Sequence, residues 1–178
     1  MGRMPAVKLI IGFIFKQDKV FQQARAIVRK RFGSIDFQSQ ILSFTHTDYY
    51  RKELGEGLYK KIISFKKLIP PQNLPEIKVF TNKVEKEFSS ANEALRTHKR
   101  LINIDPGYLN LSKLVLASTK DYIHRIYLNK GIYAEVTLFY QFKAFRPWEC
   151  TYPDYRSPQY LAIFNQIRQI YSAQLKKK

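Results

Sequence analysis

Apolar residues dominate the first segment of the chain, residues 6–15, which a single lysine interrupts. A short and almost continuous apolar run of this kind predicts a buried strand. The apolar positions of residues 21–31 then recur at helical spacing and predict an amphipathic helix. We expect Asp18 to cap this helix and Gly33 to end it.

Two further helices are predicted in the first half of the chain. The apolar positions of residues 54–65 are spaced by four and three, which predicts a helix that ends before Pro70-Pro71. The same spacing over residues 77–88 predicts another helix. Short apolar segments at residues 35–37 and 41–44 predict strands between the helices.

A β-hairpin is predicted where residues 129–131, with a glycine available for positive φ, separate the apolar segments 123–128 and 132–140. In the register that a three-residue loop sets, Arg125 faces Glu135 across the two strands. One face of the hairpin would then be polar, and it would carry Arg125, Tyr127, Tyr133, Glu135 and Thr137. The opposite face would be directed at the core, and it would carry His124, Ile132, Ala134, Val136 and Leu138.

The remaining pattern completes an α/β reading of the chain. Residues 101–104 predict an extended segment, and the type of the segment 114–117 stays open. Ser157-Pro158 supplies an N-cap and a first-turn proline for a final helix. Residues 1–178 are therefore expected to form a single compact α/β domain, with α+β as the alternative. We expect a mixed sheet flanked by helices, a C-terminal β-hairpin and a terminal helix.

Charge narrows the classes of partner. The 178 residues hold 31 Lys and Arg against 14 Asp and Glu, a formal net charge of +17, and 15% of the residues are aromatic. A basic field of this size favours anionic partners such as nucleotides, RNA or phosphorylated metabolites. The excess is spread over both halves of the chain, so a generally basic proteome is an alternative explanation.

Cysteine content and hydropathy indicate the compartment. Cys150 is the sole cysteine, so no disulfide can form within the chain, and we expect a reducing, cytoplasmic setting. We expect neither a signal peptide at residues 1–15 nor a membrane-spanning segment, because no apolar run approaches the ~20 residues that a bilayer requires.

Chemistry-bearing residues concentrate first around the segment Asn103-Ile104-Asp105-Pro106-Gly107-Tyr108. Pro106 and Gly107 predict a turn that ends a short strand and leaves Asp105 and Tyr108 at its rim. Ligands of α/β sheets bind at such rims. Asn103 and Asp105 share one face of the strand, so Asp105 is a candidate base, metal ligand or hydroxyl acceptor, or a structural turn residue.

The predicted hairpin supplies the second group of candidates. Arg125 and Glu135 are most simply a cross-strand ion pair, although Arg125 is also a candidate anion ligand and Glu135 a candidate base. His124 is a candidate catalytic residue or a buried, hydrogen-bonded histidine of the core. Lys120 joins this group as a candidate that holds an anion.

Two aromatic loops could converge on the same region. The first follows the extended segment 41–44 and offers Thr45 and Tyr50 as ligand-binding candidates. The second, residues 148–156, offers Tyr155 and Arg156. Such loops stack bases or sugars, and they also serve as rigid covers over the edge of a core.

Several of these segments resemble the signature blocks of one family, nearly end to end. The matching segments are Phe44-Thr45 with Tyr49-Tyr50, Thr81-Asn82, residues 103–109, residues 113–120, residues 124–128, residues 131–138 and residues 151–156. They are similar to those of the domain of unknown function 4416 family. The resemblance implies a small prokaryotic protein with no established activity, some of whose relatives carry a GTP-binding label. Glu149-Cys150 departs from the family pattern, in which Trp148 leads more directly into the following block.

Known catalytic and metal-binding motifs are missing from the sequence. It contains no phosphate-binding Gly-x-x-x-x-Gly-Lys-Ser/Thr loop, no paired-cysteine zinc pattern, no His-Glu-x-x-His and no Gly-x-Gly-x-x-Gly. We assign no metal ligands, although Mg²⁺ held by Asp105 and Glu135 is one form of the hypothesis.

Two classes of function remain open. The first is a pocket for a phosphorylated or nucleotide ligand, with a catalytic form in which Asp105 and Glu135 act as acid and base while Lys120, Arg125 and Arg156 hold the anion. The alternative is a non-catalytic RNA- or ribonucleoprotein-binding domain that uses basic side chains and exposed rings. An oligomeric interaction domain is a third, plainer reading.

Overall fold

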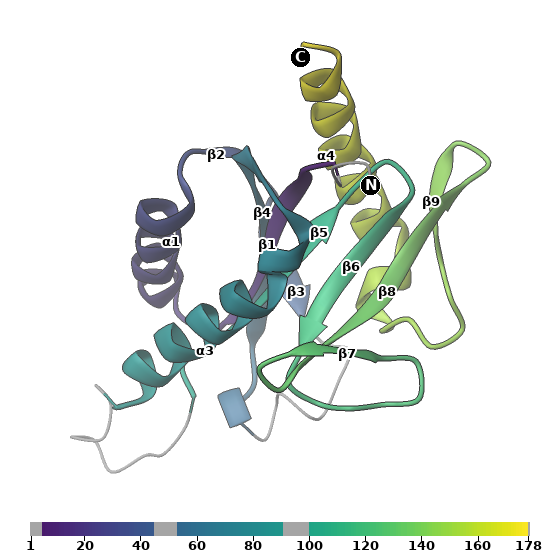
Figure 1. The fold of residues 1–178 in the computed structure, drawn as a ribbon. Coiled ribbons are helices and arrows are strands. Elements are labelled where there is room, and N and C mark those ends of the chain that lie inside the picture. Colours follow the sequence, from purple (N-terminus) through teal and green to yellow (C-terminus); the bar gives the residue numbers. More distant parts are fainter. Residues whose placement is uncertain (1–4, 45–52, 91–99, 178) are drawn as a thin grey trace.

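A computed structural model describes residues 5–44, 53–90 and 100–177. Within these residues, one nine-stranded sheet is covered by three helices (Figure 1). The helices are α1 (Asp18–Phe32), α3 (Leu74–Ser90) and α4 (Pro158–Lys176), and the short 3₁₀ turns are η1 (Pro71–Asn73) and η3 (Asp154–Arg156). The strands are β1 (Val7–Phe15), β2 (Ile35–Gln38), β3 (Leu42–Phe44), β4 (Leu58–Ile69), β5 (Ile102–Leu109), β6 (Lys113–Ser118), β7 (Ile126–Asn129), β8 (Ile132–Gln141) and β9 (Ala144–Pro147).

In the sheet, the strands lie in the order β2-β4-β1-β5-β6-β8-β7. This order shows how strands joined through helices can still form an antiparallel sheet. The connection through α1 joins β1 to β2 with β4 between them, and the connection through α3 joins β4 to β5 with β1 between them. This is the split βαβ arrangement, extended here by further strands. The expected α/β class is confirmed. The expected mixed sheet is wrong, since every described strand pair is antiparallel.

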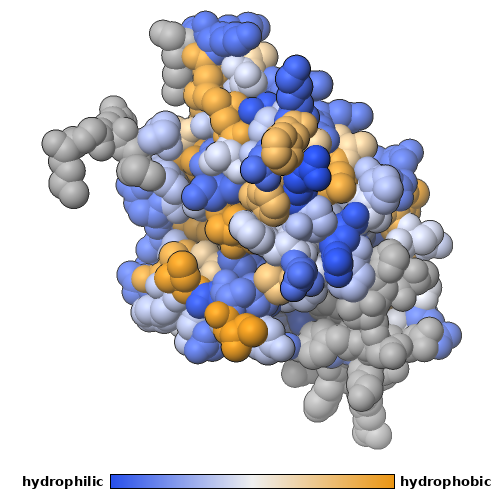
Figure 2. All heavy atoms as spheres, turned by 90° about the vertical axis from the view of Figure 1, so that its right-hand side faces the viewer, coloured by the Kyte–Doolittle hydropathy of each residue, from blue (hydrophilic) through white to orange (hydrophobic). Residues whose placement is uncertain are grey.

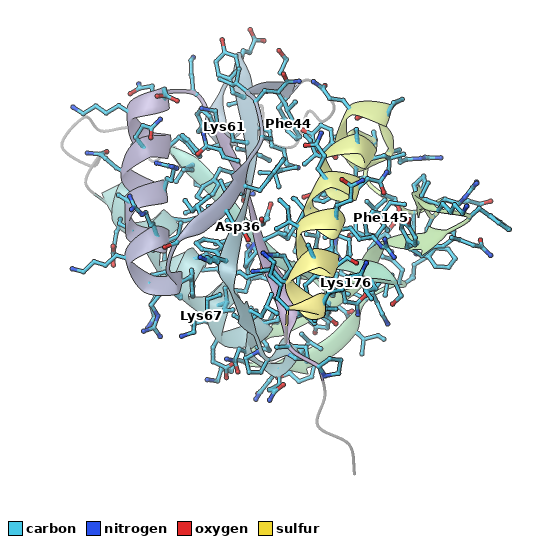
Figure 3. The ribbon with its side chains drawn as sticks, turned by 90° about the horizontal axis from the view of Figure 1, so that it is seen from above. Asp36, Phe44, Lys61, Lys67, Phe145 and Lys176 are labelled. Atoms are coloured by element: carbon cyan, nitrogen blue, oxygen red, sulfur yellow. The ribbon has the colours of Figure 1, made fainter. Side chains whose placement is uncertain are left out.

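The two faces of the sheet carry separate cores because β1 is buried along its whole length. Leu9, Ile11 and Phe13 point to one face and pack with α1 and α3. Ile10 points to the other face and packs in the cluster that contains α4. Seen from above, α1 and α4 stand on opposite sides of the strands, with Asp36 between them (Figure 3).

The helix predicted at residues 54–65 is wrong, because most of this segment belongs to the twelve-residue strand β4. β4 pairs with β1 on one edge and with β2 and β3 on the other, and its central residues, 62–65, are buried on both faces. A strand that is apolar on both faces shows no alternation, and its apolar spacing then imitates a helix.

The turn predicted at Asp105-Pro106-Gly107-Tyr108 is also wrong, since all of these residues lie inside β5. Gly107 is needed where β5 meets β6: a Cβ there would lie 2.3 Å from the carbonyl oxygen of Val115. Proline inside a strand is tolerated where its nitrogen faces no partner strand. Pro106 and Gly107 therefore mark the place where β5 separates from β6.

The hairpin of β7 and β8 has the predicted register. Tyr127 pairs with Tyr133, and this register extended by two residues places Arg125 opposite Glu135. Its loop is shorter than predicted, since Asn129 pairs directly with Ile132. The predicted faces of β8 are partly wrong: Glu135 and Thr137 are buried and Val136 is exposed, because the register against β6 shifts at this point.

The helix termini follow the predicted signals at Gly33 and at Ser157-Pro158, but the predicted cap at Asp18 is wrong. Gly33 ends α1 at a φ of 98°, and Asp18 lies in the first turn of α1, with Gln17 at the cap position. Ser157 caps α4 by accepting a hydrogen bond from the backbone N–H of Tyr160. Among the described helices, none has the length and apolar character that crossing a bilayer requires.

Candidate functional site

The candidate site lies where the sheet splits between β5 and β6. The two strands pair over Gly107–Leu109 alone, so residues 102–106 of β5 lack a partner strand on that side. Side chains of α3 take its place. Glu85 accepts a hydrogen bond from the N–H of Ile104 at 2.6 Å, and Lys78 donates to the carbonyl oxygen of Ile104 at 3.1 Å. The backbone thus stays satisfied while the sheet stays open.

A cavity of about 850 Å³ occupies this split. Segments far apart in the sequence line it: β5, β6 and β8 of the sheet, the polar side of α3, the segment after β6, and the segment that leads into α4. The lining bases are Lys60, Lys78, Lys86, Arg100, Lys120 and Arg125, and the lining acids are Glu85, Asp105, Asp121, Glu135 and Asp154. The two sets nearly cancel, so the cavity is strongly polar without a large net charge.

Asp105 is held by a network of side chains from β5 and α3. Lys78 lies 2.9 Å from one carboxylate oxygen, and the amide of Asn103 donates a short hydrogen bond to the other. Burial favours the neutral acid, but the charges of Lys78 and Lys60 and these hydrogen bonds outweigh it, so the pKa of Asp105 is lowered. Asp105 therefore stays ionised, which suits it to accept hydrogen bonds and makes it a poor proton donor.

Arg100 extends this network toward the end of α3. Its guanidinium donates to Glu85 at 2.5 Å and to Glu53 at 2.7 Å, and it also donates to the amide oxygen of Asn103 at 2.7 Å. Burial is the main cause that raises the pKa of Glu85, against the charges of Lys78 and Arg100. The end of α3 is thereby fixed to the free edge of β5.

Glu135 organises the other wall. One of its oxygens accepts from Arg125 Nε at 2.9 Å and lies 3.1 Å from His124 Nε2, and the other accepts from the hydroxyl of Thr137 at 3.1 Å. Arg125 also donates a short hydrogen bond to the hydroxyl of Tyr152. The cross-strand ion pair predicted from the hairpin register is thus present. With its oxygens engaged, Glu135 is better placed to orient His124 and Arg125 than to accept a proton from a ligand.

Lys60 and Asp154 form a buried pair at the base of the cavity. Their Nζ and Oδ2 atoms lie 2.6 Å apart, and both side chains are 4% exposed. The ammonium group also lies 4.2 Å from the ring centroid of Tyr155. Burial works against its charge, but Asp154 and Tyr160 outweigh this, and the pKa of Lys60 is raised. The pair is an internal ionic anchor for the segment before α4.

Most of the predicted site residues meet in this cavity. It is lined by the predicted Asn103, Asp105, Lys120, His124, Arg125, Glu135 and Tyr155. Tyr108 packs instead against the core of the α1 and α3 face, and Arg156 is exposed on η3 outside the lining. Thr45 and Tyr50 lie outside the described residues. His124, expected on an apolar face, stands beside Glu135 on the cavity wall.

The sequence reasoning missed the contribution of α3 and β4. The missed lining residues include Lys60 on β4 and, on α3, Lys78, Asn82, Glu85 and Ser89. The α3 residues form a polar stripe at helical spacing, beside the apolar stripe that predicted the helix. This stripe was a usable signal. Lys60 had no such signal, because the helix incorrectly predicted at residues 54–65 did not direct its side chain inward.

The described residues do not bring together three His, Cys, Asp or Glu side chains as a metal site requires. The oxygens of Asp105 and Glu135 already accept bonds from neighbouring side chains. Mg²⁺ held by this pair of carboxylates therefore finds no support in the geometry.

Comparison with known proteins places the chain in a family. Residues 5–171 match the sequence profile described as "Domain of unknown function (DUF4416)". Searches of the curated proteins and of the solved structures gave no match. The profile covers nearly the whole chain, including every strand of the sheet and the lining of the cavity. The chain therefore belongs to the DUF4416 family, as the resemblance of its sequence segments predicted.

Proposed function

We propose that the cavity between β5 and β6 binds a phosphorylated small molecule of the size of a sugar phosphate or nucleotide. The observation that carries this proposal is the cavity itself, since about 850 Å³ lies within the range of small-molecule sites. It collects hydrogen-bonding groups from many segments, and a few convergent polar groups in a cavity are typical of ligand sites. The net charge of +17 would attract an anionic ligand.

The phosphate would lie at the mouth of the cavity. Lys86 on α3 and Lys120 after β6 line the cavity and are exposed, whereas Lys60 and Lys78 are buried. A phosphate beside exposed ammonium groups keeps part of its hydration and gains charge-assisted hydrogen bonds. Deeper in the cavity, Lys78 and Arg125 are already paired with Asp105 and Glu135.

The rest of the ligand would contact the inner walls. Phe44 and Tyr152 supply ring surfaces, and Asn82 and Ser118 supply uncharged polar groups. This mixture suits a ring with hydroxyl or carbonyl substituents. A catalytic form that uses His124 to transfer a proton is less well supported, because its Nε2 lies 3.1 Å from Glu135 and its Nδ1 is enclosed without a partner.

RNA binding is less well supported by the same surface. Exposed rings do occur at Tyr122, Tyr127 and Trp148. On the side of the molecule that carries β7, β8 and β9, hydrophobic residues form separate patches among hydrophilic ones (Figure 2). The neighbouring rings of these strands form two separate pairs near opposite ends of β8, Tyr127 with Tyr133 and Phe139 with Trp148, and not a continuous row. A stacking platform needs adjacent rings along a basic groove.

We also expect the protein to act in the cytoplasm, where such metabolites occur and its lone cysteine stays reduced.

A thermal-shift panel tests the proposal. The probes are inorganic phosphate, ribose 5-phosphate and the four ribonucleoside 5′-monophosphates, with the unphosphorylated ribonucleosides and a short RNA as comparisons. A ligand at about a hundredfold above its Kd stabilises the fold by roughly 2.7 kcal/mol, which raises the Tm by about 5–10 °C.

Two matched variants locate the binding. Lys120→Gln should weaken binding about tenfold or more, as expected for the loss of a charged hydrogen bond. Lys67→Gln is the control, because Lys67 is an exposed lysine at the other end of β4 from Lys60 (Figure 3). A shift with RNA alone, or equal losses in both variants, would contradict the proposal.

A further inference from the structure

The hydroxyl of Tyr155 is a buried donor on the cavity wall, with no hydrogen-bond partner among the residues that the structure describes. Tyr155 is 3% exposed and lines the cavity. Among the described residues, no group donates to its hydroxyl or accepts from it. Among the described residues, the side-chain atoms that are fully enclosed and lack a hydrogen-bond partner are Arg25 Nε, His124 Nδ1 and Tyr160 Oη. The hydroxyl of Tyr155 is not one of them, so it keeps some exposure. Its remaining exposure therefore opens into the cavity.

Neighbouring side chains fix the direction of this hydroxyl. The ring of Tyr155 stacks on Phe164 with centroids 5.6 Å apart and planes 8° from parallel. Lys60 Nζ covers the ring at 4.2 Å from its centroid. The hydroxyl lies close to β1, since a Cβ at Gly12 would make an ordinary contact with it at 3.6 Å. A donor held this firmly loses little entropy when a ligand binds.

The surroundings decide what kind of atom this donor can bind. Burial is the main cause that raises the pKa of Tyr155 well above its usual value, and the charges of Asp154, Asp105 and Glu135 act in the same direction. The phenol is therefore neutral and protonated at physiological pH. Each of these three carboxylates is paired with a base, Lys60, Lys78 or Arg125, so these bases offer an anion no uncompensated positive charge. An uncharged oxygen does not need such a charge.

We propose that Tyr155 positions the ligand by donating a hydrogen bond to an uncharged carbonyl or hydroxyl oxygen at the inner end of the cavity. This inference rests on the proposed function and makes the ligand class narrower. The ligand is a phosphorylated compound whose other end carries carbonyl or hydroxyl oxygens, as in sugar phosphates and nucleotides. Tyr155 is a positioning residue that distinguishes such a compound from phosphate alone.

Tyr155→Phe tests the inference with Tyr160→Phe as its matched control. Both changes remove one buried hydroxyl without a protein partner from neighbouring rings 5.7 Å apart, but Tyr160 does not line the cavity. Isothermal titration of ribose 5-phosphate and uridine 5′-monophosphate should show an affinity about fivefold to tenfold lower for Tyr155→Phe. Tyr160→Phe should bind like the wild type, and both variants should keep the wild-type Tm within a few degrees.

The outcomes separate the inference from the proposed function. Wild-type affinity in Tyr155→Phe, or an equal loss in Tyr160→Phe, overturns the inference while the proposed function stands. The affinity for inorganic phosphate should not depend on the Tyr155 hydroxyl, so a similar loss for phosphate also overturns the inference. If the wild type binds no phosphorylated compound of the panel, the proposed function itself fails.

Discussion

Asp154→Asn is expected to destabilise the protein strongly, because it leaves the Lys60 ammonium group buried without a counter-charge. The two groups lie 2.6 Å apart with both side chains 4% exposed. Removing one partner of a buried ion pair costs about 3–5 kcal/mol. A domain of this kind has a total stability of roughly 5–15 kcal/mol, so this loss would be a large part of it. Lys60→Met should cost a similar amount, because it leaves Asp154 as the unpaired charge.

The double variant separates the pair from its surroundings. Lys60→Met with Asp154→Asn should cost much less than the sum of the single changes, because no unpaired charge remains. The assay is guanidinium unfolding of the four proteins, followed by circular dichroism. Lys130 and Glu76 are a matched exposed pair, 3.0 Å apart with side chains 50% and 51% exposed, and their coupling should be far smaller. Additive costs for Lys60 and Asp154 would refute the reasoning.

Two further predictions concern the split in the sheet. Gly107→Ala should lower the unfolding free energy by about 1–3 kcal/mol or more, because its Cβ would lie 2.3 Å from the Val115 carbonyl oxygen. Gly12→Ala should cost less, since its Cβ would make ordinary contacts at 3.6 Å; equal losses in chemical unfolding would count against this account of Gly107. The pKa of Asp105 is lower in the folded protein than in the unfolded chain, where it is about 3.9. Its stabilising contribution is therefore present above that value and lost as the pH falls through the folded pKa. The difference in unfolding free energy between wild type and Asp105→Asn should shrink from pH 6 to pH 2; a difference that does not change with pH would show that Asp105 does not act through its charge.

The sequence predicted those elements whose pattern depends on local physics. The buried strand β1, the helices α1, α3 and α4, and the β7–β8 register all follow from apolar spacing and turn residues. β4 could not be predicted in this way, because the burial of its two faces is produced by helices that are distant in the sequence, α1 and α3 on one face and α4 on the other. Pro106 and Gly107 likewise predicted a turn, because the sequence does not show that β5 separates from β6 at this point.

Part of the candidate site was predicted from the types of residue in short polar segments. The arrangement of the strands and helices adds the remaining residues. Asp105, Glu135 and His124 were found because they cluster in short polar segments. Lys78 and Glu85 were missed because their role depends on α3 replacing a partner strand along β5. The polar stripe of α3 indicates that these side chains share one face of the helix, but it does not show that this face lies along β5.

A crystal structure of the protein with the most strongly stabilising compound of the panel tests the central claim most directly. The account predicts that the compound lies between β5 and β6, with its phosphate beside Lys120 and Lys86 and an uncharged oxygen at the hydroxyl of Tyr155. A compound bound outside this cavity, for example along the exposed edge strand β7, would contradict it.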